Sequence, residues 1–341
     1  MHIPENYLSP VSCGVMGAAM VPVWVHAVRK VNKEIPKEKI PLLGAAAAFS
    51  FLGMMFNVPL PGGTTGHAVG GTLIAMLFGP NAACLAVSVA LLLQAVIFGD
   101  GGILAFGANC FNMAFVLPFV GYGIYRLLMG KSGRTSKARP YIAAALGSYV
   151  GLNAAALCAA VEFGIQPMLF KDAAGNALYC PYDLSVAIPA MMVPHLLVAG
   201  VIEAAFTVAV YALVRKTAPD LTYERIAEAP GKYGLKRRIP IFALIAALIA
   251  AVPLGLLATG TAWGEWGADE IADVVVNGKA LGYTPAGLEK GWSLNVLMPD
   301  YALEGMNEVV AYILSAVIGV ALLIILFKLL SLALKGRRSD P

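Results

Sequence analysis

The chain has 341 residues, of which 59% are hydrophobic and only 13% are charged, with a formal net charge of +4. Soluble domains carry about 25% charged residues, so this composition excludes an ordinary soluble protein. Several apolar stretches reach the roughly 20 residues that a helix needs to cross a bilayer. Their Leu, Ala, Ile and Gly content does not suit the alternating strands of a membrane β-barrel. The sequence therefore predicts an all-α polytopic membrane protein.

Basic residues are concentrated in four connections, which the positive-inside rule places in the cytoplasm. They are residues 29–39, residues 131–139, residues 215–238 and the tail KGRRSDP. Two such loops on one side of the membrane require an even number of crossings between them. The apolar segments that could supply these crossings are the first one, before Arg29, and then 40–58, 68–98, 103–129, 140–164, 184–214, 239–259 and 307–331.

The long apolar run from 68 to 98 decides the number of crossings. Treated as one kinked span, it leaves three crossings between the first two basic loops and violates the charge rule. Gly79, Pro80 and Asn81 interrupt the run, and glycine with proline can end one helix and begin the next. Two spans here give about nine helices, with the N-terminus outside and the C-terminus in the cytoplasm.

The connection between the last two spans, residues 260–306, is expected to lie outside and is rich in Asp and Glu. An acidic entrance would raise the local concentration of cations, although a solvated exterior loop accounts for the same composition. Arg29 and Lys30 follow the first apolar segment and no basic residue precedes it, which is the reverse of a cleaved signal peptide. The first segment is therefore expected to stay, with its free end outside, and the bulky His2 is a poor context for removal of Met1.

The opening residues MHIPENYLSP contain a candidate chelate. The Met1 amine, the His2 amide nitrogen and His2 Nδ1 can close a five-membered and a six-membered ring on one metal ion. These three nitrogens are nearly coplanar, an arrangement that Ni(II) and Cu(II) prefer. His67 is the other histidine in an exterior loop and is the candidate for the fourth ligand.

His67 follows a stretch rich in proline and glycine, NVPLPGGTTG. Such a non-helical stretch inside a membrane is tolerated only where it is buried in protein or lines a cavity. Gly66 leaves room for another backbone, and a nearby threonine hydroxyl is expected to orient the ring. The residues expected to shape the pocket, with hydrogen bonding between helices as the alternative role for the asparagines, are Asn57, Thr64, Thr65, Gly66 and Asn109.

Other ionisable residues lie in apolar segments. Glu162 and Glu203 indicate function by default, because charge in a membrane is costly, unless they lie at a helix end or pair within the bundle. They are also the candidates for an alternative function, a secondary metal transporter or channel that needs no ATPase. His26 and His195 lie within spans and are not expected to bind the metal.

The sequence gives little support to an enzyme. Gly130, Lys131 and Ser132 are similar to part of a phosphate-binding loop, but Tyr125 replaces the first glycine of the required spacing. A membrane span also precedes this segment, where such a loop follows a strand. The sequence contains no HExxH or GxSxG motif. We therefore expect a transporter subunit without its own ATPase.

The motifs resemble one family closely. MHIPENYLSP is similar to the MHIPDGFLSP-like start of the CbiM/NikM family, the substrate-binding (S) components of energy-coupling factor (ECF) transporters for cobalt and nickel. The similarity continues through PLPGGTTGHAVGGTLIAMLFGP, QAVIFGDGGILAFGANCFNMAF and TAWGEWGADE. The resemblance implies that the Met1 amine, the His2 amide nitrogen and imidazole, and the His67 imidazole bind the metal.

The resemblance also implies a division of the chain and a set of partners. Residues 1–237 resemble a seven-helix S component, and residues 238–341 resemble a CbiN/NikN-like module of two helices around an exterior loop. In YTPAGLE, Ala286 stands where the related PDGLE-like pattern has aspartate. The implied function is the capture and import of Co²⁺ or Ni²⁺ across the cell membrane of a prokaryote, without an organic cofactor. The implied partners are a transmembrane coupling (T) component, two cytoplasmic ATPases and membrane lipid, but no nucleic acid.

Overall fold

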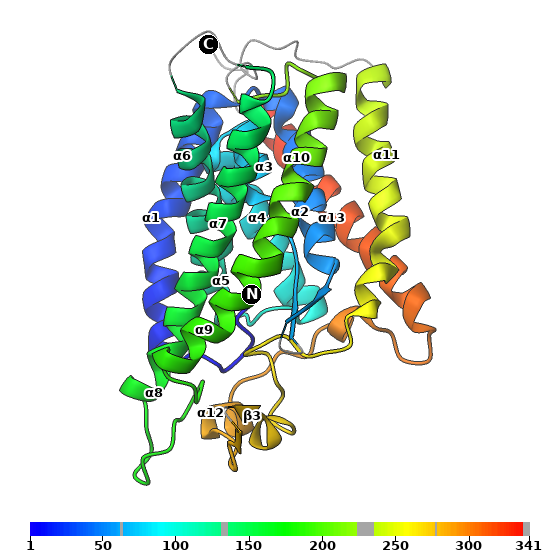
Figure 1. Ribbon diagram of the computed structural model, residues 1–341. Helices are drawn as coiled ribbons and strands as arrows, with labels where there is room; N and C mark the ends of the chain where they lie inside the picture. The colour runs from blue at the N-terminus through cyan, green and yellow to red at the C-terminus, as the bar shows by residue number, and fades with distance from the viewer. Residues whose placement is uncertain (62–63, 131–135, 224–234, 277, 337–341) are drawn as a thin grey trace.

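The protein forms an upright bundle of long helices, with a cap of loops and short helices at one end (Figure 1). The structure, a computed structural model, describes residues 1–341 apart from 62–63, 131–135, 224–234, 277 and 337–341. The basic stretches expected at 131–139, 215–238 and the C-terminal tail therefore lie partly outside the described residues, as do Lys131 and Ser132.

Eight helical segments among the described residues are long and apolar enough to cross a membrane, so the predicted all-α polytopic class is confirmed. The helical elements up to residue 217 are α1 (Pro10–Glu34), α2 (Ile40–Met55), the short α3 (Gly71–Phe78), and α4 (Pro80–Leu93) with η2 (Gln94–Phe98). They continue with α5 (Phe106–Asn109), η3 (Cys110–Val116) and α6 (Leu117–Met129), then α7 (Arg139–Gly164), and then α9 (Leu184–Pro194), η4 (His195–Ala199) and α10 (Gly200–Thr217). The later ones are α11 (Leu235–Ala251) with the 3₁₀ turn η5 (Val252–Leu257), and α13 (Glu308–Gly336). Single-turn helices η1 (Lys37–Lys39) and α8 (Gln166–Leu169) join neighbouring elements.

The apolar run 68–98 divides where the sequence predicts. Gly79 has a φ of +89° and separates α3 from α4. α3 has only 8 residues, so it is too short to cross a membrane as a helix alone. An antiparallel hairpin of β1 (Val58–Leu60) and β2 (Thr64–Gly66) precedes it, in the stretch predicted to be non-helical. Eight long segments are therefore found among the described residues where about nine were expected, and the hairpin with α3 stands in the place of the remaining one.

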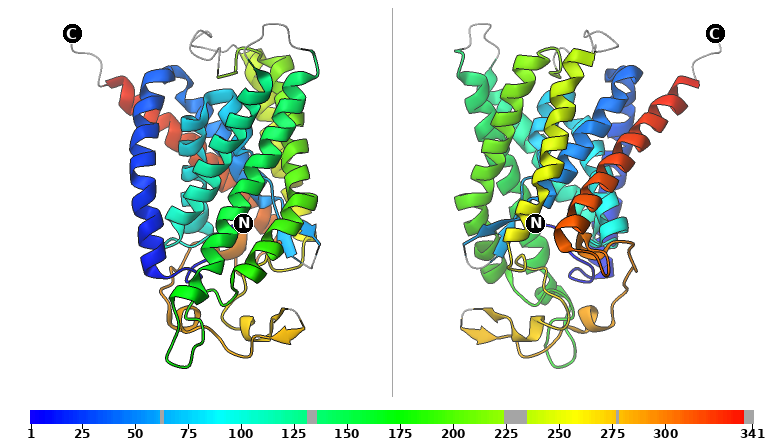
Figure 2. Two further views of the ribbon diagram at one scale, coloured as in Figure 1. Left: turned by 60° about the vertical axis from the view of Figure 1, so that its left-hand side comes forward. Right: turned by 90° about the vertical axis from the view of Figure 1, so that its right-hand side faces the viewer.

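The direction of the helices alternates so that several basic positions share one end of the bundle (Figures 1 and 2). Arg29 and Lys33 lie near the end of α1, Arg139 begins α7, and Arg215 lies near the end of α10. The cap of loops lies at the opposite end. The positive-inside rule predicts such a separation, because it places the basic positions together on the cytoplasmic side of the membrane.

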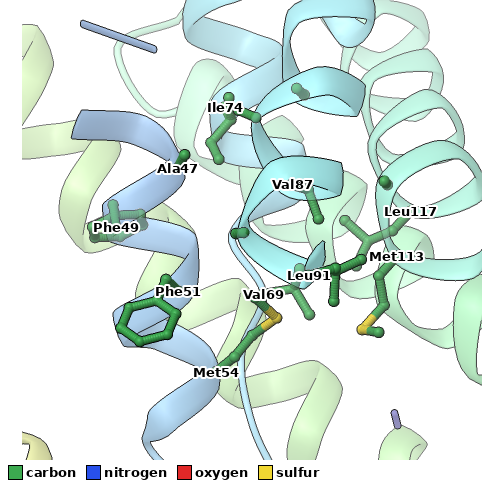
Figure 3. Packing of buried hydrophobic residues seen from close by; sticks show 14 of the residues in the cluster. Ala47, Phe49, Phe51, Met54, Val69, Ile74, Val87, Leu91, Met113 and Leu117 are labelled. Carbon is green, nitrogen blue, oxygen red and sulfur yellow. The ribbon is translucent and has the colours of Figure 1, made fainter. Parts of the chain in front are cut away.

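α2 is the buried centre of the bundle. Its residues 45–48 are four consecutive alanines, which let neighbouring helices approach closely. Phe51 and Met54 of α2 lie in the same apolar core as Val87, Leu91 and other residues from α3, α4 and α6 (Figure 3). α13 crosses the bundle obliquely and packs on α2 at Gly44, where a Cβ would lie 3.0 Å from Phe327 Cβ (Figure 2). The last helix is therefore packed into the bundle.

The cap is formed mainly by residues 258–307, with little regular structure. Its elements are η6 (Ile271–Asp273), the short hairpin of β3 (Val275–Val276) and β4 (Lys279–Ala280), α12 (Ala286–Lys290) and η7 (Pro299–Tyr301). Aromatic contacts fix the first part of the cap to the bundle, where Trp263 packs edge-on against Phe163 of α7. The cap therefore covers the end of the bundle opposite to the basic positions.

The contact between α1 and α5 depends on two glycines. A Cβ built on Gly107 would lie 2.5 Å from the Cα of Gly17, so Gly107→Ala forces the two helices apart. Overpacking of this kind costs about 1–3 kcal/mol. We expect a lower midpoint of thermal unfolding for the purified variant in detergent. Gly123→Ala is the control, because a Cβ there meets nothing within 4 Å. Equal midpoints for the two variants would contradict this packing.

Candidate metal-binding site

The N-terminal residues fold inward and enter the bundle (Figure 2). Met1, His2 and Ile3 are all buried. Asn109, at the end of α5, binds both main-chain groups of Ile3, a pair of hydrogen bonds called here the Asn109 bracket. Its Oδ1 accepts from Ile3 N at 2.7 Å, and its Nδ2 donates to Ile3 O at 3.0 Å. Gly102 N also donates to Ile3 O at 2.9 Å. Since buried backbone groups need partners, these bonds fix the depth at which the first two residues lie.

The loop between η2 and α5 wraps around this segment. The Glu5 carboxylate accepts hydrogen bonds from Ile103 N at 2.6 Å and from Leu104 N at 3.1 Å. Gly102 has to be a glycine, because a Cβ would lie 2.8 Å from the backbone of Glu5. On another side, the Tyr7 hydroxyl donates to Trp266 O at 2.8 Å. The N-terminal segment is thus held by both the bundle and the cap.

His67 follows β2 directly and faces His2. Its Nε2 lies 3.3 Å from His2 Nδ1, and the two ring centroids are 4.9 Å apart. Its other nitrogen, Nδ1, lies 3.3 Å from Ala68 O, which can only accept a hydrogen bond. The tautomer assigned from this contact carries its proton on Nδ1 and leaves the Nε2 lone pair facing His2. This is the orientation that a metal-binding histidine needs.

His2 has a second partner in the loop after η2. Its Nδ1 lies 3.0 Å from Asp100 Oδ1, whereas its buried Nε2 has no hydrogen-bond partner among the described residues. The other Asp100 oxygen accepts from Gln94 Nε2 at 3.0 Å and from the Tyr301 hydroxyl. Burial alone raises the pKa of Asp100, but the charge and hydrogen bond of His2 and the Tyr301 hydroxyl outweigh it and lower the pKa below its usual value.

The Met1 amine meets a carboxylate from the cap. Its nitrogen lies 3.4 Å from Glu265 Oε1, an ion pair between residues 264 positions apart. Burial raises the pKa of Glu265 above its ordinary value, although the Met1 amine acts in the opposite direction. Each end of the candidate chelate therefore faces a carboxylate, Glu265 at the amine and Asp100 at the imidazole.

These groups line a cavity of about 560 Å³ beneath the cap. The volume exceeds that of a single ion and leaves room for an ion with bound water. Four carboxylates lie on its wall, from both the bundle and the cap: Asp100, Glu265, Asp300 and Glu308. Among the described residues, no group of three His, Cys, Asp or Glu side chains is arranged to hold a metal ion. Met1 and His2 bring main-chain nitrogen to the wall of the same cavity.

The structure places the expected pocket residues in three different ways. Asn57, Thr65 and Gly66 line the cavity beside Met1, His2 and His67. Asn109 acts on the site through Ile3. Thr64 has a different neighbour from the one expected, because its hydroxyl accepts from Trp263 N at 2.6 Å and so fixes the hairpin to the cap. The partner of His67 Nδ1 is the Ala68 carbonyl, not a threonine hydroxyl.

Several residues near the site were not identified from the sequence. Asp100 belongs to the GDGG segment and Glu265 to the acidic loop, so each lay in a stretch that the sequence did mark. No motif or charge pattern in the sequence pointed to Gln94 or Tyr301. His195, which was not expected to bind metal, lines a small cavity beside Met1 and lies with its Nδ1 2.7 Å from Met191 O.

The geometry suits a metal ion held between the two histidines. Metal to nitrogen distances near 2.0 Å put two ligands at a right angle about 2.9 Å apart. The 3.3 Å between His2 Nδ1 and His67 Nε2 is close to that spacing. The amide nitrogen of His2 and the Met1 amine continue the same short stretch of chain.

Comparisons with known proteins agree on the kind of protein. The family described as "Cobalt uptake substrate-specific transmembrane region" matches residues 2–221, and the PDGLE domain matches residues 237–336. The chain is 49% identical over 330 residues to the "Probable fused nickel transport protein LarMN" of Lactiplantibacillus plantarum, covering 96% of this chain and 97% of that protein. It is 48% identical over 336 residues to the "Fused nickel transport protein NikMN" of Rhodobacter capsulatus, covering 95% of each.

A solved structure described as a transition metal transporter shares 56% sequence identity with this chain. The superposition covers 63% of this chain and 93% of the other, with a TM-score of 0.59. The similarity therefore extends from the sequence to the arrangement of helices.

The bracket formed by Asn109 can be tested directly. Asn109→Ala leaves Ile3 N and Ile3 O without their side-chain partners, at a cost of about 1–3 kcal/mol for a buried group. We expect the amide of Ile3 to exchange with solvent about 10-fold faster, measured by hydrogen exchange and mass spectrometry. Asn153→Ala is the control, because Asn153 donates to Tyr149 O within its own helix. Unchanged exchange in Asn109→Ala would show that the bracket does not hold the segment.

Proposed function

The chain belongs to the family of cobalt uptake substrate-specific transmembrane regions, and from this premise we propose that it captures Ni²⁺ or Co²⁺ and takes part in its import. The observation that carries the proposal is the pair of histidine nitrogens 3.3 Å apart in a polar cavity, with the tautomer of His67 fixed by Ala68. The names of the relatives, which are nickel transport proteins, support the same class of substrate.

The proposed ligands are four nitrogen atoms. They are the Met1 amine, the deprotonated amide nitrogen of His2, His2 Nδ1 and His67 Nε2. A nitrogen set of this kind disfavours Mg²⁺ and Ca²⁺, which require oxygen ligands. Because the first three nitrogens are nearly coplanar, the site favours Ni²⁺ over Co²⁺.

Two of the proposed ligand atoms are paired with carboxylates in the structure. Glu265 pairs with the Met1 amine and Asp100 with His2 Nδ1, so both contacts have to break when the ion binds. The amine and the amide have to lose protons at the same time, and such sites bind metal more weakly in acid. The two carboxylates are suitably placed to stabilise the positive charge that enters.

The rest of the assembly is part of the proposal. Residues 1–237 act as the S component of an ECF-type transporter, and residues 238–341 act as a fused CbiN/NikN-like module. The N-terminus faces outside and the C-terminus faces the cytoplasm, in the cell membrane of a prokaryote. A T component and two cytoplasmic ATPases drive the transport cycle, while this chain supplies the metal site.

A free N-terminus is the most demanding part of the ligand set. One extra alanine before Met1 moves the amine away from the chelate, so we expect it to abolish Ni²⁺ binding as completely as His67→Ala does. Isothermal titration of the purified proteins with Ni²⁺ and with Co²⁺ measures this. Retained affinity in the extended protein, beside loss in His67→Ala, would remove Met1 from the ligand set.

The requirement for ATPases separates the proposal from its alternative, an independent transporter or channel. We expect the chain reconstituted alone in lipid vesicles to bind Ni²⁺ without sustained uptake, and uptake to require the T component, the ATPases and ATP. Radioactive ⁶³Ni²⁺ in the vesicle interior is the readout. Sustained accumulation by the chain alone would favour the alternative.

A further inference from the structure

Glu203 is a fully buried carboxylate in a membrane-spanning helix, in the first turn of α10. A carboxylate in such a position is costly unless hydrogen bonds compensate for its lost water. Glu203 is not one of the proposed metal ligands, and it does not line the cavity that contains them. Its hydrogen-bond partners indicate what it does.

Both oxygens of Glu203 accept from the main chain just after His67. Oε2 accepts from Val69 N at 2.8 Å, and Oε1 accepts from Gly70 N at 3.0 Å. Gly70, with a φ of +72°, is the N-cap of α3, so its N–H has no partner within the helix. A carboxylate is also favoured by the dipole at this end of α3.

The same short loop is held from its other side by α2. Ser50 Oγ donates to Val69 O at 2.7 Å, and Phe49 stacks on Phe206 of α10 next to Gly70, with ring centroids 4.6 Å apart. His67 itself donates to Ala68 O. The orientation of the His67 ring therefore depends on the backbone of residues 68–70. Glu203 accepts hydrogen bonds from two of the main-chain N–H groups of that backbone, and Ser50 binds one carbonyl.

The orientation of Glu203 follows from the helix that carries it. The π-helical turn η4 directly precedes α10, and such turns are frequent at functional sites because an inserted residue re-aims the following face. His195, the first residue of η4, lies beside Met1 in a small cavity. One continuous helix thus carries both His195, which lines a cavity with Met1, and Glu203, which binds the loop after His67.

We infer that Glu203 is a positioning residue, which sets the direction of His67 Nε2 toward the metal. The inference rests on the proposed function, because it needs His67 to be a ligand. In Glu203→Gln the amide nitrogen replaces one acceptor oxygen and faces a main-chain N–H. The loop then shifts, His67 Nε2 moves relative to the other ligand atoms, and the ligand field of the metal changes. Changes to groups that orient metal ligands typically weaken binding about 10-fold to 100-fold.

The test compares the wild type, His67→Ala, Glu203→Gln and the control Glu162→Gln. Glu162 is also a buried carboxylate in a membrane helix, but it accepts from Asn112 Nδ2 at 2.7 Å. Ni²⁺ affinity is measured by titration and the ligand field by visible absorption of the nickel-loaded protein. We expect Glu203→Gln to bind about 10-fold to 100-fold more weakly with a shifted absorption band, and Glu162→Gln to match the wild type.

The outcomes separate the inference from the proposed function. Absence of nickel binding by the wild type would defeat the proposed function and the inference with it. Wild-type binding that His67→Ala abolishes, with Glu203→Gln unchanged in affinity and spectrum, would overturn the inference alone. So would weaker binding by Glu203→Gln with an unshifted band, or an equal loss in Glu162→Gln.

A second variant keeps the test decisive if Glu203→Gln does not fold. Glu203→Asp keeps the carboxylate but shortens its side chain by one methylene, so that it can no longer reach both Val69 N and Gly70 N, and we expect binding about 3-fold to 10-fold weaker with a smaller shift of the same band. An affinity and a spectrum identical to those of the wild type would then overturn the inference.

Discussion

The cavity that contains Met1, His2 and His67 depends on one constraint, which is the burial of the first three residues of the chain. A chain end brings a charged amine and unpaired main-chain groups, and a helical bundle has no free partners for them. Here Asn109 and Gly102 satisfy Ile3, Asp100 meets His2, and Glu265 meets Met1. The glycine-rich loop before α5 has to approach the segment closely to supply these partners. The α-amine and two imidazoles consequently gather in one cavity.

The C-terminal part of the chain contributes to this enclosure directly. Glu265 and Tyr301 come from the cap, and each contacts the N-terminal segment or its partner Asp100. Trp263 N donates to Thr64 Oγ1 and so fixes the hairpin that leads to His67. α13, which follows the cap, packs on α2 in the centre of the bundle. The cap and the candidate site therefore form one continuous structure, because residues of the cap are the partners of Met1, Asp100 and Thr64.

Local signals in the sequence predicted most of the elements, and together with the family resemblance they gave the ligands we propose. The break at Gly79, the non-helical stretch before His67 and the separation of basic and acidic ends all follow from residue type and spacing. The length of α3 did not follow, because the hairpin spans part of the same crossing. Contacts between distant segments were also missed, such as Asp100 with Tyr301 and Glu203 with Val69. Hydrophobic periodicity shows which face of a helix is buried, but not which side chain it meets.

The most direct test of the account is the coordination of the bound ion in the full-length protein. X-ray absorption at the nickel edge, recorded on the wild type loaded with one Ni²⁺, counts the neighbouring atoms and reports whether they are coplanar. We expect four nitrogen neighbours in a plane, two of them from imidazole rings. A six-coordinate ion bound largely by oxygen would contradict this expectation, because the carboxylates Asp100 and Glu265 would then be ligands themselves.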